Sequence, residues 1–184
     1  MIKQPDSKSS IEARDKKKEE WDQMAGLYEK WCQKSVLMQQ MSYYSSINEL
    51  EKDGIEGKTF VEIGCGPCPM GQRLVQRGAK KVYGVDISSE MIEIARTMLT
   101  EKGMIDKFEL IVADILDDSF KLPEKVDCIV MSYAISAFIN EYENLKKLLD
   151  QCKKCIKDDG MIFICEFSYV DQPKNDFAHE MYTA

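Results

Sequence analysis

From residue 57 onward, short apolar runs alternate with longer segments in which apolar residues recur every three or four positions. The short runs are typical of buried strands, and the longer segments are typical of helices. Nearly continuous apolar strands separated by helices suit a parallel sheet that is covered on both faces. The pattern therefore predicts an α/β fold with a doubly wound, mostly parallel sheet, whose strands lie at 59–63, 81–87, 108–113, 126–131 and 161–165.

Three helices are predicted between these strands, and their ends carry typical capping residues. The first runs from about Met70 to Gly78, because glycine commonly ends a helix. The second follows Ser88, whose hydroxyl group can accept from a free backbone N–H, and it ends at Gly103. The third carries the apolar positions between 145 and 156 and is expected to end at the polar turn 158–160.

Two further helices are predicted ahead of the sheet. Residues 1–18 are polar and end in the charged run 14–18, which predicts a flexible tail or the fraying start of a helix. Beyond this tail, apolar side chains at steps of three and four predict one face of a helix, formed by Trp21, Met24, Tyr28 and Trp31. A second helix carries a similar pattern at Leu37, Met41, Tyr44 and Ile47.

The length of 184 residues suits a single domain. The sixteen residues after Ser168 are too few for another helix and a pair of strands, so we expect a sheet of five strands without a further C-terminal strand pair. The predicted divisions are a polar flexible tail at 1–18 and one domain at 19–184, which comprises a helical cap at 19–56, the sheet core at 57–168 and a short tail at 169–184.

Composition and charge narrow the possible partners. Hydrophobic residues make up 44% and charged residues 31%, as in a globular chain. The formal net charge of −7 disfavours nucleic acid as a partner, because it repels phosphate groups. The start lacks a signal-peptide run, and the longest mostly apolar stretch, Val126 to Ile139, is too short to cross a membrane. With seven cysteines and no secretory signal, we expect a protein of the reducing cytoplasm without a membrane partner.

Candidate chemistry lies directly after the predicted strands, because ligands of open parallel sheets bind beyond the carboxyl ends. Gly64 and Gly66 follow the first strand and let the backbone turn tightly against a ligand. Asp86 ends the second strand twenty residues after Gly66, the spacing at which an acid reaches the ribose hydroxyls of a nucleotide. A nicotinamide-dependent oxidoreductase is disfavoured, because Pro69 occupies the third glycine position of the dinucleotide pattern. Glu62 would repel a pyrophosphate and attract an ammonium group instead.

The segment Glu62-Ile63-Gly64-Cys65-Gly66 resembles the first motif of the class I S-adenosylmethionine-dependent methyltransferases. This resemblance covers roughly residues 21–168 and implies a Rossmann-like core with S-adenosyl-L-methionine as cofactor. It implies that the first loop holds the methionine part, that Asp86 binds the ribose, and that Asp114 and Ile115 face the adenine. The cofactor-binding residues expected on this basis are Tyr28, Glu62, Gly64, Cys65, Gly66, Asp86, Ile87, Met91, Asp114, Ile115 and Ser132.

The sequence departs from the family pattern at two points. Cys68 stands where many members carry a third glycine, so either the backbone stands off slightly or the thiol faces the cofactor. The usual C-terminal strand pair, which often completes the substrate pocket, is also missing from the prediction. The predicted function is the transfer of a methyl group from S-adenosylmethionine to a small-molecule acceptor. The alternative is a non-catalytic S-adenosylmethionine-binding subunit, or a truncated remnant of such an enzyme.

The sequence identifies no catalytic residue, acceptor atom or oligomeric state. His179 is the only histidine, and its place in the short tail predicts a solvent-exposed bystander. Glu166, Tyr133 and Tyr169 follow strand ends but suit packing or solvent exposure equally well. The two Cys-x-x-Cys pairs begin at Cys65 and Cys152, in the cofactor loop and in a predicted helix, where zinc knuckles are not expected. We therefore expect no metal site.

Overall fold

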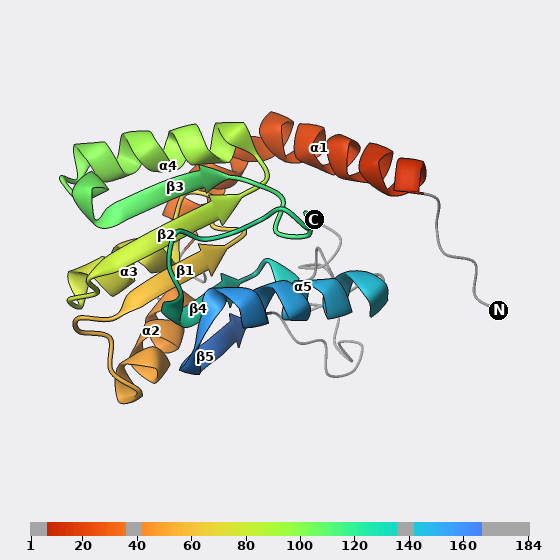
Figure 1. The fold of residues 1–184 in the computed structure, drawn as a ribbon. Helices are drawn as coiled ribbons and strands as arrows, with labels where there is room; N and C mark the ends of the chain where they lie inside the picture. The colour runs from red at the N-terminus through yellow and green to blue at the C-terminus, as the bar shows by residue number, and fades with distance from the viewer. Residues whose placement is uncertain (1–6, 36–41, 136–141, 167–184) are drawn as a thin grey trace, which may run out of the picture.

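The computed structural model describes residues 7–35, 42–135 and 142–166, and they form a five-stranded sheet flanked by helices (Figure 1). The sheet order is β3-β2-β1-β4-β5, and every neighbouring pair is parallel. The strands are β1 Thr59–Ile63, β2 Lys81–Asp86, β3 Phe108–Val112, β4 Val126–Ser132 and β5 Ile156–Cys165. The predicted α/β fold with a parallel Rossmann-like sheet is thereby confirmed.

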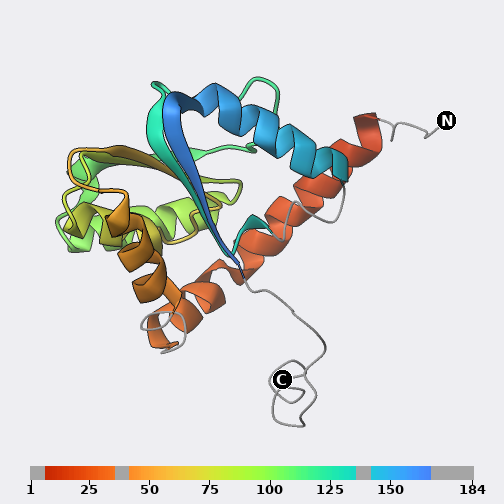
Figure 2. The same ribbon diagram turned by 90° about the horizontal axis from the view of Figure 1, so that it is seen from below.

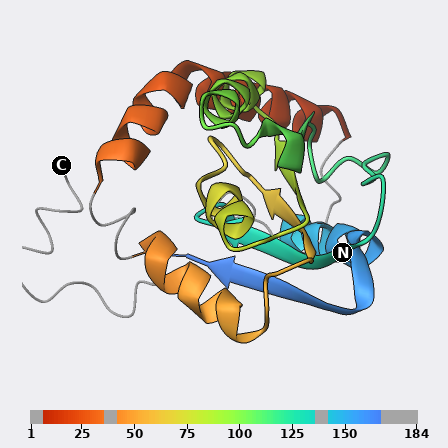
Figure 3. The same ribbon diagram turned by 90° about the vertical axis from the view of Figure 1, so that its left-hand side faces the viewer.

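Helices cover both faces of the sheet (Figure 2). One face carries α2 (Tyr43–Lys52), α3 (Pro69–Gln76) and α4 (Ser89–Glu101), with α3 between the other two (Figure 3). The opposite face carries α5 (Tyr142–Cys155), and the short 3₁₀ turn Ile105–Lys107 leads from α4 into β3. The long helix α1 (Ser7–Lys34) runs past the ends at which the strands finish and packs along α4 (Figure 1).

The core has two halves, one on each face of the sheet. Phe60 of β1 belongs to the cluster under α2, α3 and α4, whereas its neighbour Val61 belongs to the cluster under α5. Adjacent strand residues point to opposite faces, so a strand covered on both sides must be apolar at nearly every position. This requirement explains why all five residues of β1 are buried.

The structure corrects the boundary of the predicted polar tail, because residues 7–18 belong to α1. This stretch is rich in lysine and glutamate, which are good helix formers, and Lys18 forms an ion pair with Asp22 one turn later. Arg14 also contacts Asp114, beyond β3, at 3.3 Å. Local propensity and tertiary contact therefore extend the helix into a segment that carries almost no apolar side chain.

The predicted faces of the first two helices are shifted in the structure. Met24 and Trp31 are about half exposed, at 50% and 48%, whereas Ala25 and Cys32 of the same helix are buried. In α2 the buried tyrosine is Tyr43 rather than the predicted Tyr44. Helix α1 packs mainly on α4, so only one narrow side of α1 is buried. The predicted positions Leu37 and Met41 lie outside the described residues.

The fifth strand begins earlier than predicted. Helix α5 ends at Cys155, and Ile156 already pairs with Val126 of β4. The register then shifts, so that Cys128 pairs with Met161, and the polar residues 157–160 form an irregularity within the strand. The turn expected to end the helix is therefore a bulge inside β5. The predicted tail 169–184, with Tyr169 and His179, lies outside the described residues.

The loop between β1 and α3 packs closely on β2, because Gly84 of β2 has no side chain. Cys68 adopts a left-handed backbone conformation, with φ of 56°, and its thiol is completely buried. A Cβ atom added at Gly84 would lie 2.7 Å from Cys68 Sγ, 2.9 Å from Leu110 Cδ2 and 3.2 Å from Cys65 Sγ. The thiol at the family's third glycine position thus fills the space above Gly84 and is buried against β2.

Gly84→Ala should therefore lower the free energy of unfolding by about 1–3 kcal/mol, because an extra methyl group has no room beside Cys68 and Leu110. Adding Cys68→Ala should recover part of this loss, since it removes the closest contact. Gly26→Ala is the matched control, because a Cβ there meets nothing within 4 Å and alanine favours the helix. Urea denaturation measures all four proteins, and an unaffected Gly84→Ala protein would contradict this packing.

Candidate functional site

The strand order reverses at β1, which lies between β2 on one side and β4 on the other. In open parallel sheets the crevice at such a reversal, beyond the carboxyl ends, is where ligands bind. Residues of the predicted site lie at the ends of β1, β2 and β4 and in the loops that follow β1, β2 and β3. The structure therefore brings most of that set to one edge of the sheet.

The loop after β1 turns at Gly64 and Gly66, which both have positive φ, at 63° and 47°. Gly64 is exposed, and a Cβ there would lie 2.6 Å from Cβ of Ala134, beyond β4. The Gly66 N–H donates to Asp86 Oδ2 at 2.8 Å. Glycine is thus required here both for the backbone conformation and for the close approach of the two loops.

Asp86 joins the ends of β1 and β2. Its Oδ2 atom accepts from the N–H of Gly66, and its Oδ1 atom accepts from the N–H of Ser88 at 2.9 Å. Burial raises the pKa of this carboxyl above its usual range, although these N–H groups favour the charged form. Ile87, the next residue, is half-buried.

Glu62 lies beneath the loop rather than on its open side. Its side chain is buried at 2% exposure, and Oε2 accepts from the N–H of Gly71 in the first turn of α3 at 2.7 Å. Burial raises the pKa of this carboxyl to about 8, against the effect of the N–H groups of Gly71 and Met70. The predicted position facing a ligand ammonium group is therefore corrected: Glu62 satisfies the start of α3, where backbone N–H groups lack helical partners.

Cys65 also points away from the open edge. Its thiol is buried and lies 3.5 Å from the carbonyl oxygen of Gly66, while its N–H donates to Val85 in β2. Only the backbone of Cys65 therefore remains close to the predicted cofactor position.

Tyr28 of α1 lies over the loop. A Cβ at Gly66 would be 3.7 Å from Tyr28 Cε1 and 3.8 Å from Met91 Sδ, so these two side chains enclose Gly66 from above and from α4. Trp21 meets the Tyr28 ring edge-on, with 5.7 Å between the centroids. The aromatic positions that predicted a helix face thus place one ring over the glycine turn.

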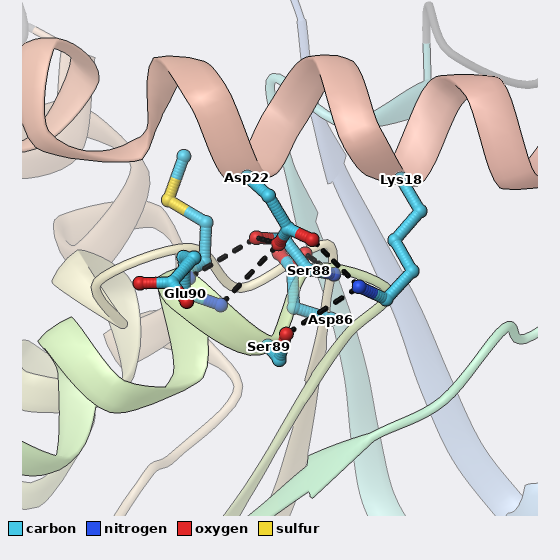
Figure 4. Close-up of polar contacts among 7 residues, drawn as sticks. Lys18, Asp22, Asp86, Ser88, Ser89 and Glu90 are labelled. Atoms are coloured by element: carbon cyan, nitrogen blue, oxygen red, sulfur yellow. Dashed lines mark hydrogen bonds and ion pairs between the residues drawn. The ribbon is translucent and has the colours of Figure 1, made fainter.

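Helix α1 is fastened to the start of α4 by Asp22 (Figure 4). Asp22 Oδ1 accepts from Ser88 Oγ at 2.5 Å and from the N–H of Glu90 at 3.3 Å. Ser88 in turn caps α4, because its Oγ atom accepts from the N–H of Met91. Lys18 Nζ lies 2.6 Å from Asp22 Oδ2 and 3.4 Å from Ser89 Oγ. The cluster lies next to Asp86, so α1 is held directly beside the predicted ribose site.

The loop after β3 carries Asp114 and Ile115. Asp114 Oδ1 accepts from the N–H of Leu116 at 2.8 Å, and Oδ2 lies 3.3 Å from Arg14 Nη1. Ile115 is buried at 4% exposure and packs in the core cluster under α5. Both residues lie at the end of β3, on the side of the site where the resemblance places the adenine.

The end of β4 carries two unusual residues. Ser132 Oγ is buried and has no hydrogen-bond partner among the described residues. Tyr133 follows it with φ of 57°, a conformation that costs free energy in a residue other than glycine. Its N–H donates to Cys165 O at 2.8 Å, and its hydroxyl oxygen accepts from Cys165 Sγ at 3.3 Å. A buried hydroxyl without a partner, beside a strained residue, is typical of a ligand site.

Sequence reasoning missed two residues of this edge, Arg14 and Asp22, and it left the role of Tyr133 open. Arg14 falls in the predicted flexible tail, although the Lys16–Glu20 and Lys18–Asp22 spacings already indicate a helix. Asp22 carries no signal, because only the packing of α1 on α4 shows its role. The strain at Tyr133 is a backbone property that composition does not reveal.

A separate cavity of about 590 Å³ lies on the outer side of α3, with walls from α1, α2 and α4. Its lining includes Gln33, Tyr44, Arg73 and Lys102, but none of the predicted cofactor residues.

Within the described part of the chain, no three His, Cys, Asp or Glu side chains are grouped to hold a metal ion. None of the described helices is long and apolar enough to span a membrane.

Comparison with known proteins agrees with this geometry. A family model described as a methyltransferase domain matches residues 60–160. A ubiquinone biosynthesis O-methyltransferase of Idiomarina loihiensis is 28% identical over 116 residues, which are 62% of this chain and 44% of the relative. Protein arginine N-methyltransferase 1 of Saccharomyces cerevisiae is 32% identical over 108 residues, which are 59% of this chain and 30% of the relative.

The fold is also similar to that of solved structures. An S-adenosylmethionine-dependent methyltransferase from Clostridium acetobutylicum superposes with a TM-score of 0.63 and 21% identity, covering 81% of this chain and 58% of the other. The chain spans about half the length, or less, of the two curated relatives described above.

Glu62→Gln should make stability less dependent on pH. Unfolding returns the carboxyl pKa from about 8 to its ordinary value of about 4.3, so between these values the unfolded chain has released a proton that the folded chain retains. Stability then falls as the pH rises through this window. The amide of the variant cannot ionise and still accepts from Gly71, so its advantage should grow by roughly 1 kcal/mol per pH unit from about pH 5 to about pH 8.

Urea denaturation across this pH range provides the measurement. Glu101→Gln removes an exposed carboxylate from α4 and serves as the control, which should follow the wild-type profile. A constant difference between the Glu62→Gln and wild-type proteins would show that Glu62 is already ionised in the folded state.

Proposed function

The chain belongs to the methyltransferase-domain family, and on that premise we propose that it transfers the methyl group of S-adenosylmethionine to a small-molecule acceptor. The observation that carries this proposal is the edge formed by Gly64, Gly66 and Asp86 at the reversal of the strand order. The resemblance, the matching family model and the fold all lead to the same cofactor.

The residues of this edge fit S-adenosylmethionine. Gly64 is exposed, so the methionine part can approach the backbone of the loop there, and Tyr28 and Met91 enclose the buried Gly66 beside it. Asp86 supplies carboxylate oxygens for the ribose hydroxyls. The buried Ser132 hydroxyl group lacks a partner among the described residues, which fits a polar cofactor atom at the end of β4.

The adenine is assigned to the end of β3. Asp114 offers a carboxylate to its exocyclic amine, and Ile115 and Ile87 supply apolar surface near the ring. Glu62 is assigned an indirect role, because its carboxyl group holds the start of α3 and thereby the shape of the loop. Cys65 contributes through its backbone.

When bound, the cofactor supplies a methyl group on a positively charged sulfur, which a nucleophile of the acceptor can take directly. This chain's residues then have to align the two reactants and exclude water, which are major sources of rate enhancement. Tyr133 is unsuited to act as a general base near neutral pH, because burial raises its pKa to about 12. We therefore assign the protein a positioning role in catalysis.

A small acceptor is favoured by the way α1 covers the site. Tyr28 encloses Gly66, and Asp22 fastens the helix to α4, which leaves little access for a folded protein chain. The net charge of −7 disfavours nucleic acid. The seven cysteines are all free thiols, which suits the reducing cytoplasm as the place of action.

Thermal unfolding with S-adenosylmethionine, S-adenosylhomocysteine or NAD tests the cofactor. A ligand at a hundred times its dissociation constant adds about 2.7 kcal/mol, so the first two should raise the melting temperature clearly, and NAD should not. Asp86→Asn should reduce the rise, because the ribose loses a charged acceptor, whereas the exposed Asp106→Asn control should match the wild type. No rise with either S-adenosylmethionine or S-adenosylhomocysteine would refute the proposal.

The acceptor class can be tested with S-adenosylmethionine that carries a labelled methyl group. After incubation with a cell extract and removal of the unreacted, positively charged cofactor on a cation-exchange resin, we expect the label in the fraction that passes a small-pore filter rather than in precipitated protein. Label found mainly in protein would instead favour a protein acceptor, as the name of the yeast relative would suggest.

A further inference from the structure

Helix α1 touches the proposed cofactor site at three places along its length. Tyr28 lies over Gly66 at the methionine end, and Asp22 binds Ser88 beside the ribose position. Nearer to its start, α1 places Arg14 against Asp114, at the adenine end. The first two contacts engage neither the Asp86 carboxylate nor the exposed Gly64, but the third engages the group that the adenine would use.

Both carboxylate oxygens of Asp114 already have a partner within the chain. Oδ1 accepts from the N–H of Leu116, a local contact that fixes the carboxylate at the end of β3. Oδ2 lies 3.3 Å from Arg14 Nη1. An exocyclic amine donates one hydrogen bond to a carboxylate oxygen, and Oδ2 is the oxygen that the local backbone leaves open.

We propose that Arg14 is a built-in competitor for the adenine end of the cofactor site. This inference rests on the proposed function, and it adds that cofactor binding replaces the ion pair of Arg14 with Asp114. Arg14 then sets the affinity for every ligand that carries adenine, without contacting the acceptor.

The ion pair is suited to such an exchange. The side chains of Arg14 and Asp114 are 31% and 19% exposed, so water and salt can reach the pair. Ion pairs of this kind contribute little, and breaking one costs a ligand only about two- to five-fold in affinity. Further along α1, the Asp22 and Ser88 contact can keep the helix on α4 while Arg14 moves away.

Arg14→Gln should therefore strengthen the binding of an adenosine-type ligand by about two- to five-fold. The probe is 5′-methylthioadenosine, which has the adenine, ribose and sulfur of the cofactor but no charged amino-acid part. Isothermal titration calorimetry gives its dissociation constant for the wild type and for each variant. Lys16→Gln is the matched control, because it removes the same charge from an exposed position of α1 that pairs with Glu20.

The dependence of probe binding on salt concentration distinguishes competition by Arg14 from a merely structural role of this residue. Raising sodium chloride from about 50 mM to about 500 mM weakens an exposed ion pair. The wild type and Lys16→Gln should then bind the uncharged probe more tightly, whereas Arg14→Gln should show no such gain. Arg14→Lys keeps the charge and should stay close to the wild type.

The outcomes distinguish this inference from the proposed function. Wild-type protein that binds S-adenosylmethionine, together with an Arg14→Gln variant that binds the probe equally or more weakly, would overturn the competition alone. Weaker binding would mean that Arg14 supports the adenine site rather than competing for it. If neither protein binds S-adenosylmethionine or the probe, both proposals fail.

Discussion

The arrangement of the whole site depends on the carboxylate of Asp86. Its two oxygens accept from the N–H groups of Gly66 and Ser88, and they thereby hold the loop after β1 against the start of α4. Ser88 continues this chain of contacts, because its hydroxyl group caps α4 and donates to Asp22 of α1. One partly buried charge thus fixes the glycine turn, and through Ser88 it also helps to fix the helix that covers it.

The side chains of Glu62 and Cys68 form a second constraint, because both are buried beneath the loop after β1 and fix its position on the sheet. Glu62 satisfies an N–H group at the start of α3, which has no helical partner, and burial holds its pKa at about 8 as a consequence. Cys68 fills the space that the absent side chain of Gly84 leaves in β2. Cys68 takes the place of the family's third glycine, and Gly84 on the neighbouring strand makes room for its thiol. The loop therefore stays close to the sheet.

The sequence was most informative where the local pattern and the tertiary contacts agree. The bounds of β1 were predicted to the residue, because a strand buried on both faces is apolar at most positions and glycine follows its end. Ser88 was identified as a cap from the residue type alone. Gly64, Gly66 and Asp86 meet at one edge as their spacing indicated, because the order of a strand, a glycine turn, a helix and a second strand determines where they lie.

Prediction failed where packing overrides local pattern. A carboxylate at the end of β1 can face a ligand or the adjacent helix start, and only the path of α3 shows that Glu62 faces the helix. Residues 7–18 lack an apolar stripe, yet α1 extends through them, because their lysine and glutamate residues favour a helix and Arg14 meets Asp114 beyond β3. That contact stabilises the helix with the same carboxylate that the proposed adenine site requires. If Arg14 competes with the ligand as proposed, the same ion pair contributes to the stability of α1 in the free protein and opposes binding, so stability and affinity change in opposite directions at this residue.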